Sequence, residues 1–158
     1  MQKQLYRWLL LKTKIYLDTT IISALFDERT PERMSQTAAF WQHINDYNVF
    51  ISELVFDEIK AAPQPLLDKM LEKVSNFTSL SMTDDAEYLA DLYIKNDIFP
   101  EKYSDDALHA ALATINQIGI LLSWNYTHLV KIKTRRMVAL INTINNYSPI
   151  EIITPPEL

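Results

Sequence analysis

KIYLDTT, residues 14–20, joins a short apolar run to a carboxylate and two threonines. The β-branched and aromatic residues before Asp18 predict a strand, and a helix is expected to begin just beyond it, near Ile21. Similar short runs recur at residues 48–51, about 78–82, 120–123 and 151–153. Helical patterns separate these runs, and this alternation predicts an α/β domain with a mostly parallel sheet covered by helices on both faces.

The helical patterns have recognisable starts. Thr30, Pro31 and Glu32 supply a capping residue, a proline at the first helical position and an early acid, and the helix they begin is expected to end near Tyr47. The other predicted helices cover residues 53–61, residues 65–74, a stretch from Thr83 through Tyr93, a stretch from Ser104, and residues 126–145. Because such sheets bind ligands beyond the carboxyl ends of their strands, chemistry is expected at that edge.

Composition narrows the classes of function. The chain has 158 residues, 48% of them hydrophobic, and a net charge of -5, which argues against a large basic surface for nonspecific nucleic-acid binding. The absence of cysteine excludes disulfides, zinc–thiolate sites and a thiol nucleophile. The single glycine, Gly119, excludes the glycine-rich phosphate loops of nucleotide-binding proteins.

We expect residues 1–12 to form an N-terminal surface extension and residues 13–158 to form one domain. The apolar run from Trp8 to Leu11 is too short to span a membrane, so no membrane association is expected. A chain without cysteine is expected to have a cytoplasmic location.

Three carboxylates lie at predicted boundaries among apolar neighbours: Asp18 after the first strand, Glu58 in the helix after the second, and Asp106 in the first turn of the helix from Ser104. Burying an unpaired carboxylate is costly, and a shared divalent cation is the simplest explanation of all three together. Taken singly, each has an ordinary alternative: a helix cap, an exposed ion pair with Lys60, and a first-turn helix charge, respectively.

SDDALHAALA, residues 104–113, is the most specific of these segments. Asp106, His109 and the small residues at 110 and 113 share one helical stripe, which lets the helix pack closely on the sheet with its acid at the rim of a cleft. Asp105 points elsewhere and is expected to accept bonds from first-turn amides. His109 is expected to be a packed or hydrogen-bonding group rather than a metal ligand.

Four ordered motifs resemble those of PIN-domain ribonucleases, including VapC-type toxins. They are Asp18 in YLDTT, Glu58 six residues after Ser52, Asp106 in DALHAALA, and ILLSWNYTHL at residues 120–129. The resemblance spans residues 14 to about 154. It implies a PIN-like three-layer α/β/α fold, a Mg²⁺ or Mn²⁺ site formed by the three acids, and hydrolysis of RNA phosphodiester bonds.

The chain departs from the family pattern at Asn125, where a further Asp is usual. Asn offers a carbonyl oxygen to a cation or holds a water, but it removes a negative charge. Asn125 is therefore a fourth candidate catalytic residue, with Thr19, Ser123, Asp105 and His109 as candidate supporting residues. The alternative to an enzyme is a PIN-like binding or regulatory module that has lost catalysis.

The resemblance also implies partners. Toxins of this family are held inactive by an antitoxin and commonly form homodimers, so an RNA substrate, a cognate antitoxin and a homodimer are expected. Four basic residues follow the fourth motif and are either RNA-phosphate contacts or a solvated helix face. They are Lys131, Lys133, Arg135 and Arg136.

Overall fold

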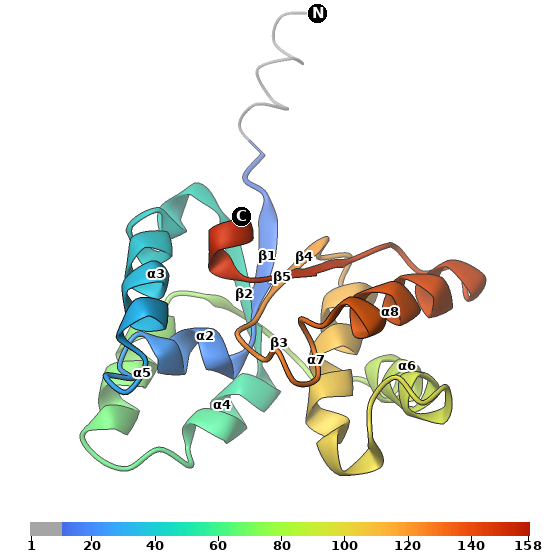
Figure 1. Cartoon of the computed structure of the whole chain (residues 1–158), viewed down its shortest axis with the longest axis horizontal. Helices are drawn as coiled ribbons and strands as arrows, with labels where there is room; N and C mark the ends of the chain where they lie inside the picture. The colour runs from blue at the N-terminus through green and yellow to red at the C-terminus, as the bar shows by residue number, and fades with distance from the viewer. Residues whose placement is uncertain (1–10) are drawn as a thin grey trace, which may run out of the picture.

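Five parallel strands form the central sheet of the computed structural model, which describes residues 11–158 (Figure 1). The strands are β1 (Lys14–Leu17), β2 (Asn48–Ser52), β3 (Thr78–Leu80), β4 (Ile120–Leu122) and β5 (Glu151–Ile153). Their order across the sheet is β3-β2-β1-β4-β5. The prediction of an α/β domain with a parallel sheet is confirmed, and each predicted strand is present.

The central strand β1 pairs with β2 on one side and β4 on the other. Tyr16 is in register with Phe50 of β2, and Leu17 is in register with Leu122 of β4. The chain builds outward from β1 to β2 and β3, then returns to the other side of β1 for β4 and β5. This reversal between β1 and β4 is the switch point at which open α/β sheets place a ligand cleft.

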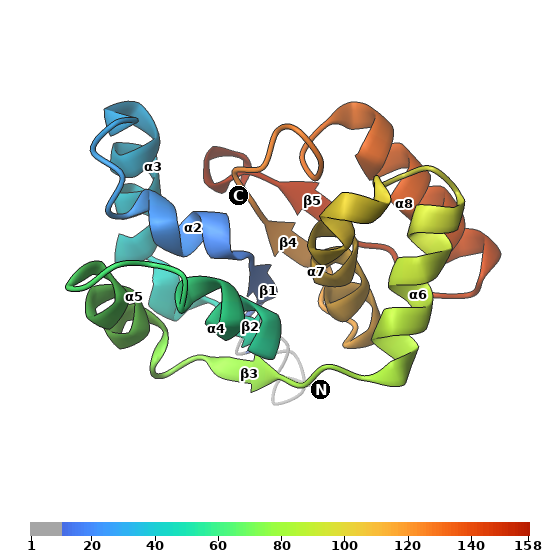
Figure 2. The same cartoon turned by 90° about the horizontal axis from the view of Figure 1, so that it is seen from below.

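Helices lie to both sides of this sheet (Figures 1 and 2). One side carries α2 (Thr19–Ala24), α3 (Pro31–Gln42), α4 (Glu53–Ile59) and α5 (Leu66–Val74). The other side carries α6 (Asp84–Lys95), α7 (Ser104–Ile115) and α8 (Ile132–Ile144). The arrangement has three layers, α/β/α, as predicted.

The core is densest around β1 and α7. Ile15, Tyr16 and Leu17 are completely buried, because β1 has a neighbouring strand on each edge and helices over both faces. On α7 the buried residues include four alanines, at 107, 110, 111 and 113, whose small side chains let this helix approach β4 and α6 closely. That close approach places the first turn of α7 beside the carboxyl edge of the sheet.

The last long helix was predicted from Tyr126 but begins only at Ile132. The carbonyl of Asn125 accepts bonds from the backbone N–H groups of both Leu129 and Val130, and its side-chain Oδ1 accepts the N–H of His128. These bonds close a local turn in place of a continuing helical ladder. Similarly, α3 ends at Gln42, and a separate 3₁₀ turn at Ile44–Asp46 completes the predicted helical stretch.

Three helices end in a left-handed residue that is not glycine. In α7, Gln117 has φ 55°, its N–H bonds to Thr114 O at 3.0 Å, and the N–H of Ile118 bonds to Ala113 O at 2.9 Å. This is a Schellman motif, with an apolar residue directly after the left-handed position. The same paired bonds follow α6 and α8, where the left-handed residues are Asp97 and Asn146.

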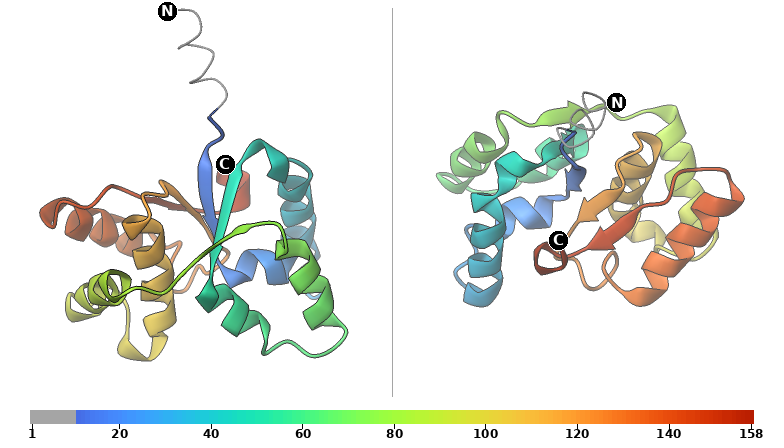
Figure 3. Two further views of the ribbon diagram at one scale, coloured as in Figure 1. Left: turned by 180° about the vertical axis from the view of Figure 1, so that it is seen from behind. Right: turned by 90° about the horizontal axis from the view of Figure 1, so that it is seen from above.

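The two ends of the described chain lie near β1 (Figure 3). Residues 1–10 of the predicted extension lie outside the described residues, Leu11 is exposed, and Lys12 Nζ donates to Asn45 O at 2.6 Å. The C-terminal 3₁₀ turn η3 (Pro155–Glu157) packs against α3. Within residues 11–158, no helix is both long and apolar enough to cross a membrane.

Candidate functional site

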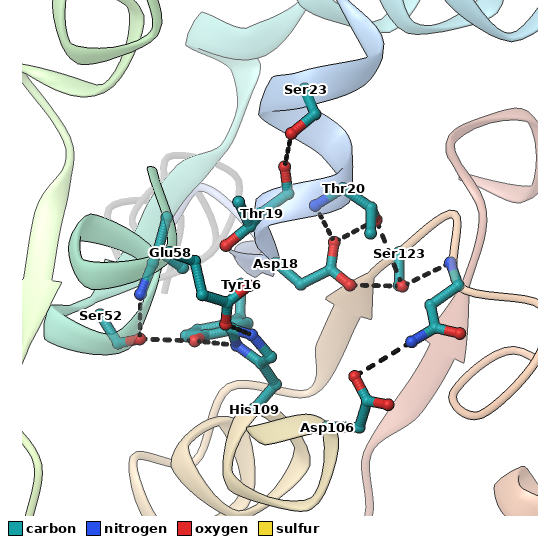
Figure 4. A network of polar contacts seen from close by, with 12 residues as sticks. Tyr16, Asp18, Thr19, Thr20, Ser23, Ser52, Glu58, Asp106, His109 and Ser123 are labelled. Atoms are coloured by element: carbon teal, nitrogen blue, oxygen red, sulfur yellow. Dashed lines mark hydrogen bonds and ion pairs between the residues drawn. The ribbon is translucent and has the colours of Figure 1, made fainter. Parts of the chain in front are cut away.

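Asp18 directly follows β1 and caps α2 at the switch point of the sheet (Figure 4). Its Oδ1 accepts the Thr20 N–H at 3.0 Å and the Thr20 hydroxyl at 2.5 Å, and its Oδ2 accepts the Ser123 hydroxyl at 2.5 Å. Ser123 directly follows β4, so the carboxylate joins the two strands between which the sheet order reverses. Because both oxygens accept bonds, the geometry suits the ionised form.

The buried surroundings of Asp18 disfavour its ionised form. The side chain is almost fully buried, and burial raises the pKa of Asp18 above its ordinary value. The nearby charge of His109 and the hydroxyls of Ser123 and Thr20 lower the pKa in part, without reversing the shift. A cation at this edge would stabilise the carboxylate further.

Glu58, on α4, is held by a buried chain of polar groups. Its Oε1 lies 2.7 Å from His109 Nε2, and His109 Nδ1 lies 2.8 Å from the hydroxyl of Tyr16. That hydroxyl lies 2.7 Å from Ser52 Oγ at the end of β2. Because an ionised Glu58 only accepts, His109 Nε2 carries a proton and donates it. The chain therefore fixes Glu58 from two strands and α7 together.

Charge interactions outweigh burial at this pair. Burial lowers the pKa of His109, but the hydrogen bond and charge of Glu58, with the charges of Asp18 and Asp106, raise the pKa above its ordinary value overall. Burial raises the pKa of Glu58, but the hydrogen bond and charge of His109, together with the Thr19 hydroxyl, more than compensate, so the pKa lies below its ordinary value. Both directions favour an imidazolium–carboxylate pair.

Asp106 lies in the first turn of α7 and is half-buried. Its Oδ1 accepts the Asn125 side-chain N–H at 3.0 Å, while Asn125 Oδ1 accepts the His128 backbone N–H at 3.0 Å. The second bond requires an oxygen, so it fixes the orientation of the amide. The side-chain oxygen of Asn125 therefore accepts the His128 backbone N–H, and its side-chain nitrogen donates to Asp106.

The pKa of Asp106 is raised, principally by burial, with a smaller contribution from the charge of Glu58. His109, His128 and the amide of Asn125 act in the opposite direction without cancelling it. The same imidazole, His109, therefore acts electrostatically on all three predicted acids. The three acids, far apart in sequence, surround one region at the carboxyl edge of the sheet (Figure 4).

A divalent cation is not enclosed by these acids as they stand. Within the described part of the chain, no group of three or more His, Cys, Asp or Glu side chains is arranged to hold a metal ion. However, Glu58 Oε2 and Asp106 Oδ2 accept no hydrogen bond of ordinary geometry from residues 11–158, and the buried Thr19 hydroxyl makes none there, although it lies close enough to Glu58 to lower the pKa of that acid. This all-oxygen donor set fits Mg²⁺ or Mn²⁺, which keep several waters.

The other predicted site residues, Asp105 and the four basic residues, form no hydrogen bond with the three acids in the described chain. Asp105, in the first turn of α7, is exposed. Arg135 donates to both carboxylate oxygens of Glu157, at 3.0 and 3.2 Å, and to Val130 O at 2.8 Å, so its guanidinium is occupied. The other three basic residues of this stretch are exposed: Lys131, Lys133 and Arg136.

Sequence reasoning missed the contacts of three residues beside the acids. Tyr16 was predicted only as a strand residue, yet its hydroxyl links Ser52 to His109. Thr20 holds both Asp18 and the backbone N–H of Trp124. Arg33 lines a pocket of about 330 Å³ with Thr20 and Glu58. The alternation of β1, which gives Tyr16 and Asp18 the same face, was an available signal.

No protein-family model matches the chain, and no curated protein matches it. Nine chains of solved structures match. One is described as VapBC2 from Rickettsia felis bound to a DNA fragment from their promoter; it is 12% identical, and the match covers 73% of this chain and 90% of that one, with a TM-score of 0.49. This likeness is weak, and function is inferred from the site itself.

Proposed function

We propose that this chain is a PIN-like, metal-dependent endoribonuclease that hydrolyses RNA phosphodiester bonds with Mg²⁺ or Mn²⁺, acting as the toxin of a toxin–antitoxin pair. The observation that carries the proposal is the convergence of Asp18, Glu58 and Asp106 from three elements on the switch point of a parallel sheet. Acids brought together at a cost in burial are typical of sites that bind a cation.

Each side chain has a distinct task in this proposal. Asp18, held rigidly by Ser123 and Thr20, would bind the cation together with the unpartnered oxygens of Glu58 and Asp106. When bound, Mg²⁺ or Mn²⁺ neutralises phosphate charge and acidifies a water for attack. The Thr19 hydroxyl, beside Glu58, would bind a water or a phosphate oxygen, and His109 positions Glu58.

The test is cleavage of a fluorogenic single-stranded RNA by the purified chain in Mg²⁺, Mn²⁺ or EDTA. Asp18→Asn and Asp106→Asn should each lose about 100-fold or more in activity, as expected for groups that act on the reacting phosphate. Asp91→Asn, a charge-matched change on the exposed face of α6, should retain full activity. Equal cleavage by all the proteins, or full cleavage in EDTA, would refute the proposal.

One observation favours a second function, a PIN-like binding or regulatory module without catalysis. The amide of Asn125 already donates to Asp106, so the fold partly stabilises this acid without a cation. Calorimetric titration with Mn²⁺ separates the two functions, because an enzyme should take up the ion and a lapsed site should show little uptake. Circular dichroism of each variant distinguishes loss of the site from loss of the fold.

The partners of the proposed toxin are a cognate antitoxin and a second copy of the chain, in the cytoplasm. These rest on the resemblance of the four sequence motifs to PIN-domain toxins. Light scattering during gel filtration measures the homodimer directly, and a mass equal to 18.4 kDa would identify a monomer.

A further inference from the structure

A second hollow shares the segment after β4 with the acid site. This aromatic groove, of about 670 Å³, is formed by the first turns of α3, the segment after β4 and the C-terminal turn; its lining includes Thr30, Arg33, Trp124 and Tyr126. Successive side chains of residues 123–126 alternate between the acid site and the groove. The side chains of Ser123 and Asn125 donate to Asp18 and Asp106, and Trp124 and Tyr126 line the groove. One short segment therefore builds both the acid site and its neighbour.

Arg33 connects the two hollows. It lines the aromatic groove and also the smaller pocket that contains Thr19 and Glu58. Its guanidinium makes no hydrogen bond or ion pair with any residue from 11 to 158, and the nearby Asp27 is paired with Arg29 instead. Glu32 lines the same groove but forms no ion pair with Arg33 in the described chain, so this guanidinium is available to an external anion.

Trp124 holds this cation in place. The guanidinium carbon of Arg33 lies 5.4 Å from the centroid of the indole ring, a cation–π distance. The indole is almost fully buried, and its Nε1–H donates to the buried Thr37 hydroxyl at 2.9 Å. The indole of Trp124 is therefore fixed in position and orients Arg33, and it is not free to stack on a ligand.

Tyr126 supplies the free aromatic surface. Its side chain is 54% exposed, and its ring centroid lies 6.3 Å from that of Trp124. Its hydroxyl forms no hydrogen bond with other residues in the described range. An exposed ring next to an oriented guanidinium is the combination that proteins use to stack an unpaired base and bind the adjoining phosphate.

We propose that the aromatic groove is a nucleotide subsite for single-stranded RNA. Arg33 binds a backbone phosphate next to the one that meets the acids, and Tyr126 stacks on an unpaired base. The substrate is single-stranded because the base faces of a duplex are already covered. This inference rests on the proposed RNA substrate but not on hydrolysis, so binding and cleavage test it separately.

The test measures binding of a fluorescent ten-nucleotide 2′-O-methyl RNA by anisotropy in EDTA, where no metal-dependent hydrolysis takes place. Tyr126→Ala should weaken binding about 5- to 100-fold, while Tyr126→Phe keeps the ring and the affinity. Arg33→Gln should weaken binding and reduce the slope of log affinity against log salt by about 0.7, the value for one phosphate of a single strand. Tyr126→Ala should leave that slope unchanged.

Two variants on α6 serve as matched controls: Tyr88→Ala removes an exposed tyrosine and Lys95→Gln an exposed cation, and both should bind as the parent does. Wild-type affinity in Tyr126→Ala and Arg33→Gln would refute the subsite, even if the protein cleaves RNA. Equal affinity for a duplex, or no binding of the single strand, would also refute it. Variant-sensitive binding without any cleavage would uphold the subsite and refute the nuclease.

Discussion

Asn125→Asp places a fourth acid beside Asp106, and its effect should depend on metal and pH. Asn125 Nδ2 lies 3.0 Å from Asp106 Oδ1, so the substitution replaces a donor with a second carboxylate oxygen. Two carboxylates with charge centres about 4 Å apart repel by about 4 kcal/mol at an effective dielectric constant near 20. We expect Asn125→Asp to be about 3 kcal/mol less stable than the parent at pH 8 in EDTA, because partial proton sharing relieves some repulsion.

The pH dependence has a definite sign. Burial already raises the pKa of Asp106, and a carboxylate at 125 raises it further, so the folded state binds more protons than the unfolded state between the two pKa values. The free energy of unfolding then falls as the pH rises through that interval. The destabilisation should be small below the ordinary carboxyl pKa of 3.8 and reach its full size above the raised one.

The assay is urea denaturation from about pH 3 to pH 8, in EDTA and in Mn²⁺. Asn125→Ala is the control, because it loses the same hydrogen bond, at about 1 kcal/mol, without adding charge. Mn²⁺ at about 100 times its dissociation constant should stabilise Asn125→Asp by about 2.7 kcal/mol and Asn125→Ala far less. If the Asp and Ala variants unfold alike at every pH and metal concentration, the acids do not share a cation site.

Three further changes test the fold around the site. Tyr16→Phe leaves two buried polar partners without their bond and should cost about 1–3 kcal/mol in urea denaturation, with helix content unchanged. Gln117→Gly relieves a left-handed residue and should stabilise the protein by about 1 kcal/mol; a lower melting temperature would contradict this. Arg135 lowers the pKa of Glu157 to about 2, so Glu157→Gln should destabilise above pH 4.5, and the difference should vanish as the pH falls through about 2.

Sequence patterns were sufficient for the strands and not for the contacts. Each strand is a short apolar run between turn residues, and that pattern is local. The late start of α8 depends on the backbone N–H groups of Leu129 and Val130, which both bond to the backbone carbonyl of Asn125. Hydrophobic periodicity does not predict such bonds. Likewise, Ser52 and Tyr16 have ordinary positions in their strands, and only the register of β1 with β2 brings their hydroxyls within 2.7 Å.

The candidate site shows the same division. Asp18, Glu58 and Asp106 were identifiable because each is an acid among apolar residues. Ser123, His109 and Asn125 were also named as candidates, but which acid each one contacts was not predictable, because each pair joins two different elements: Ser123 with Asp18, His109 with Glu58, and Asn125 with Asp106. A sequence shows where a buried charge needs compensation, and the fold decides what supplies it.

Those separate partners bear on how the acids would bind a cation. Glu58 is already paired with an imidazole whose raised pKa favours a positive charge, and Asp106 already accepts an amide N–H. A divalent ion would therefore add to these interactions through the second oxygen of each carboxylate, or displace them. Either route gives a smaller gain in free energy than binding among unpartnered acids, because the charge is already partly neutralised. Removing the imidazole charge should thus strengthen metal binding, and Mn²⁺ affinity that rises with pH beyond the titration of the acids would reveal this competition.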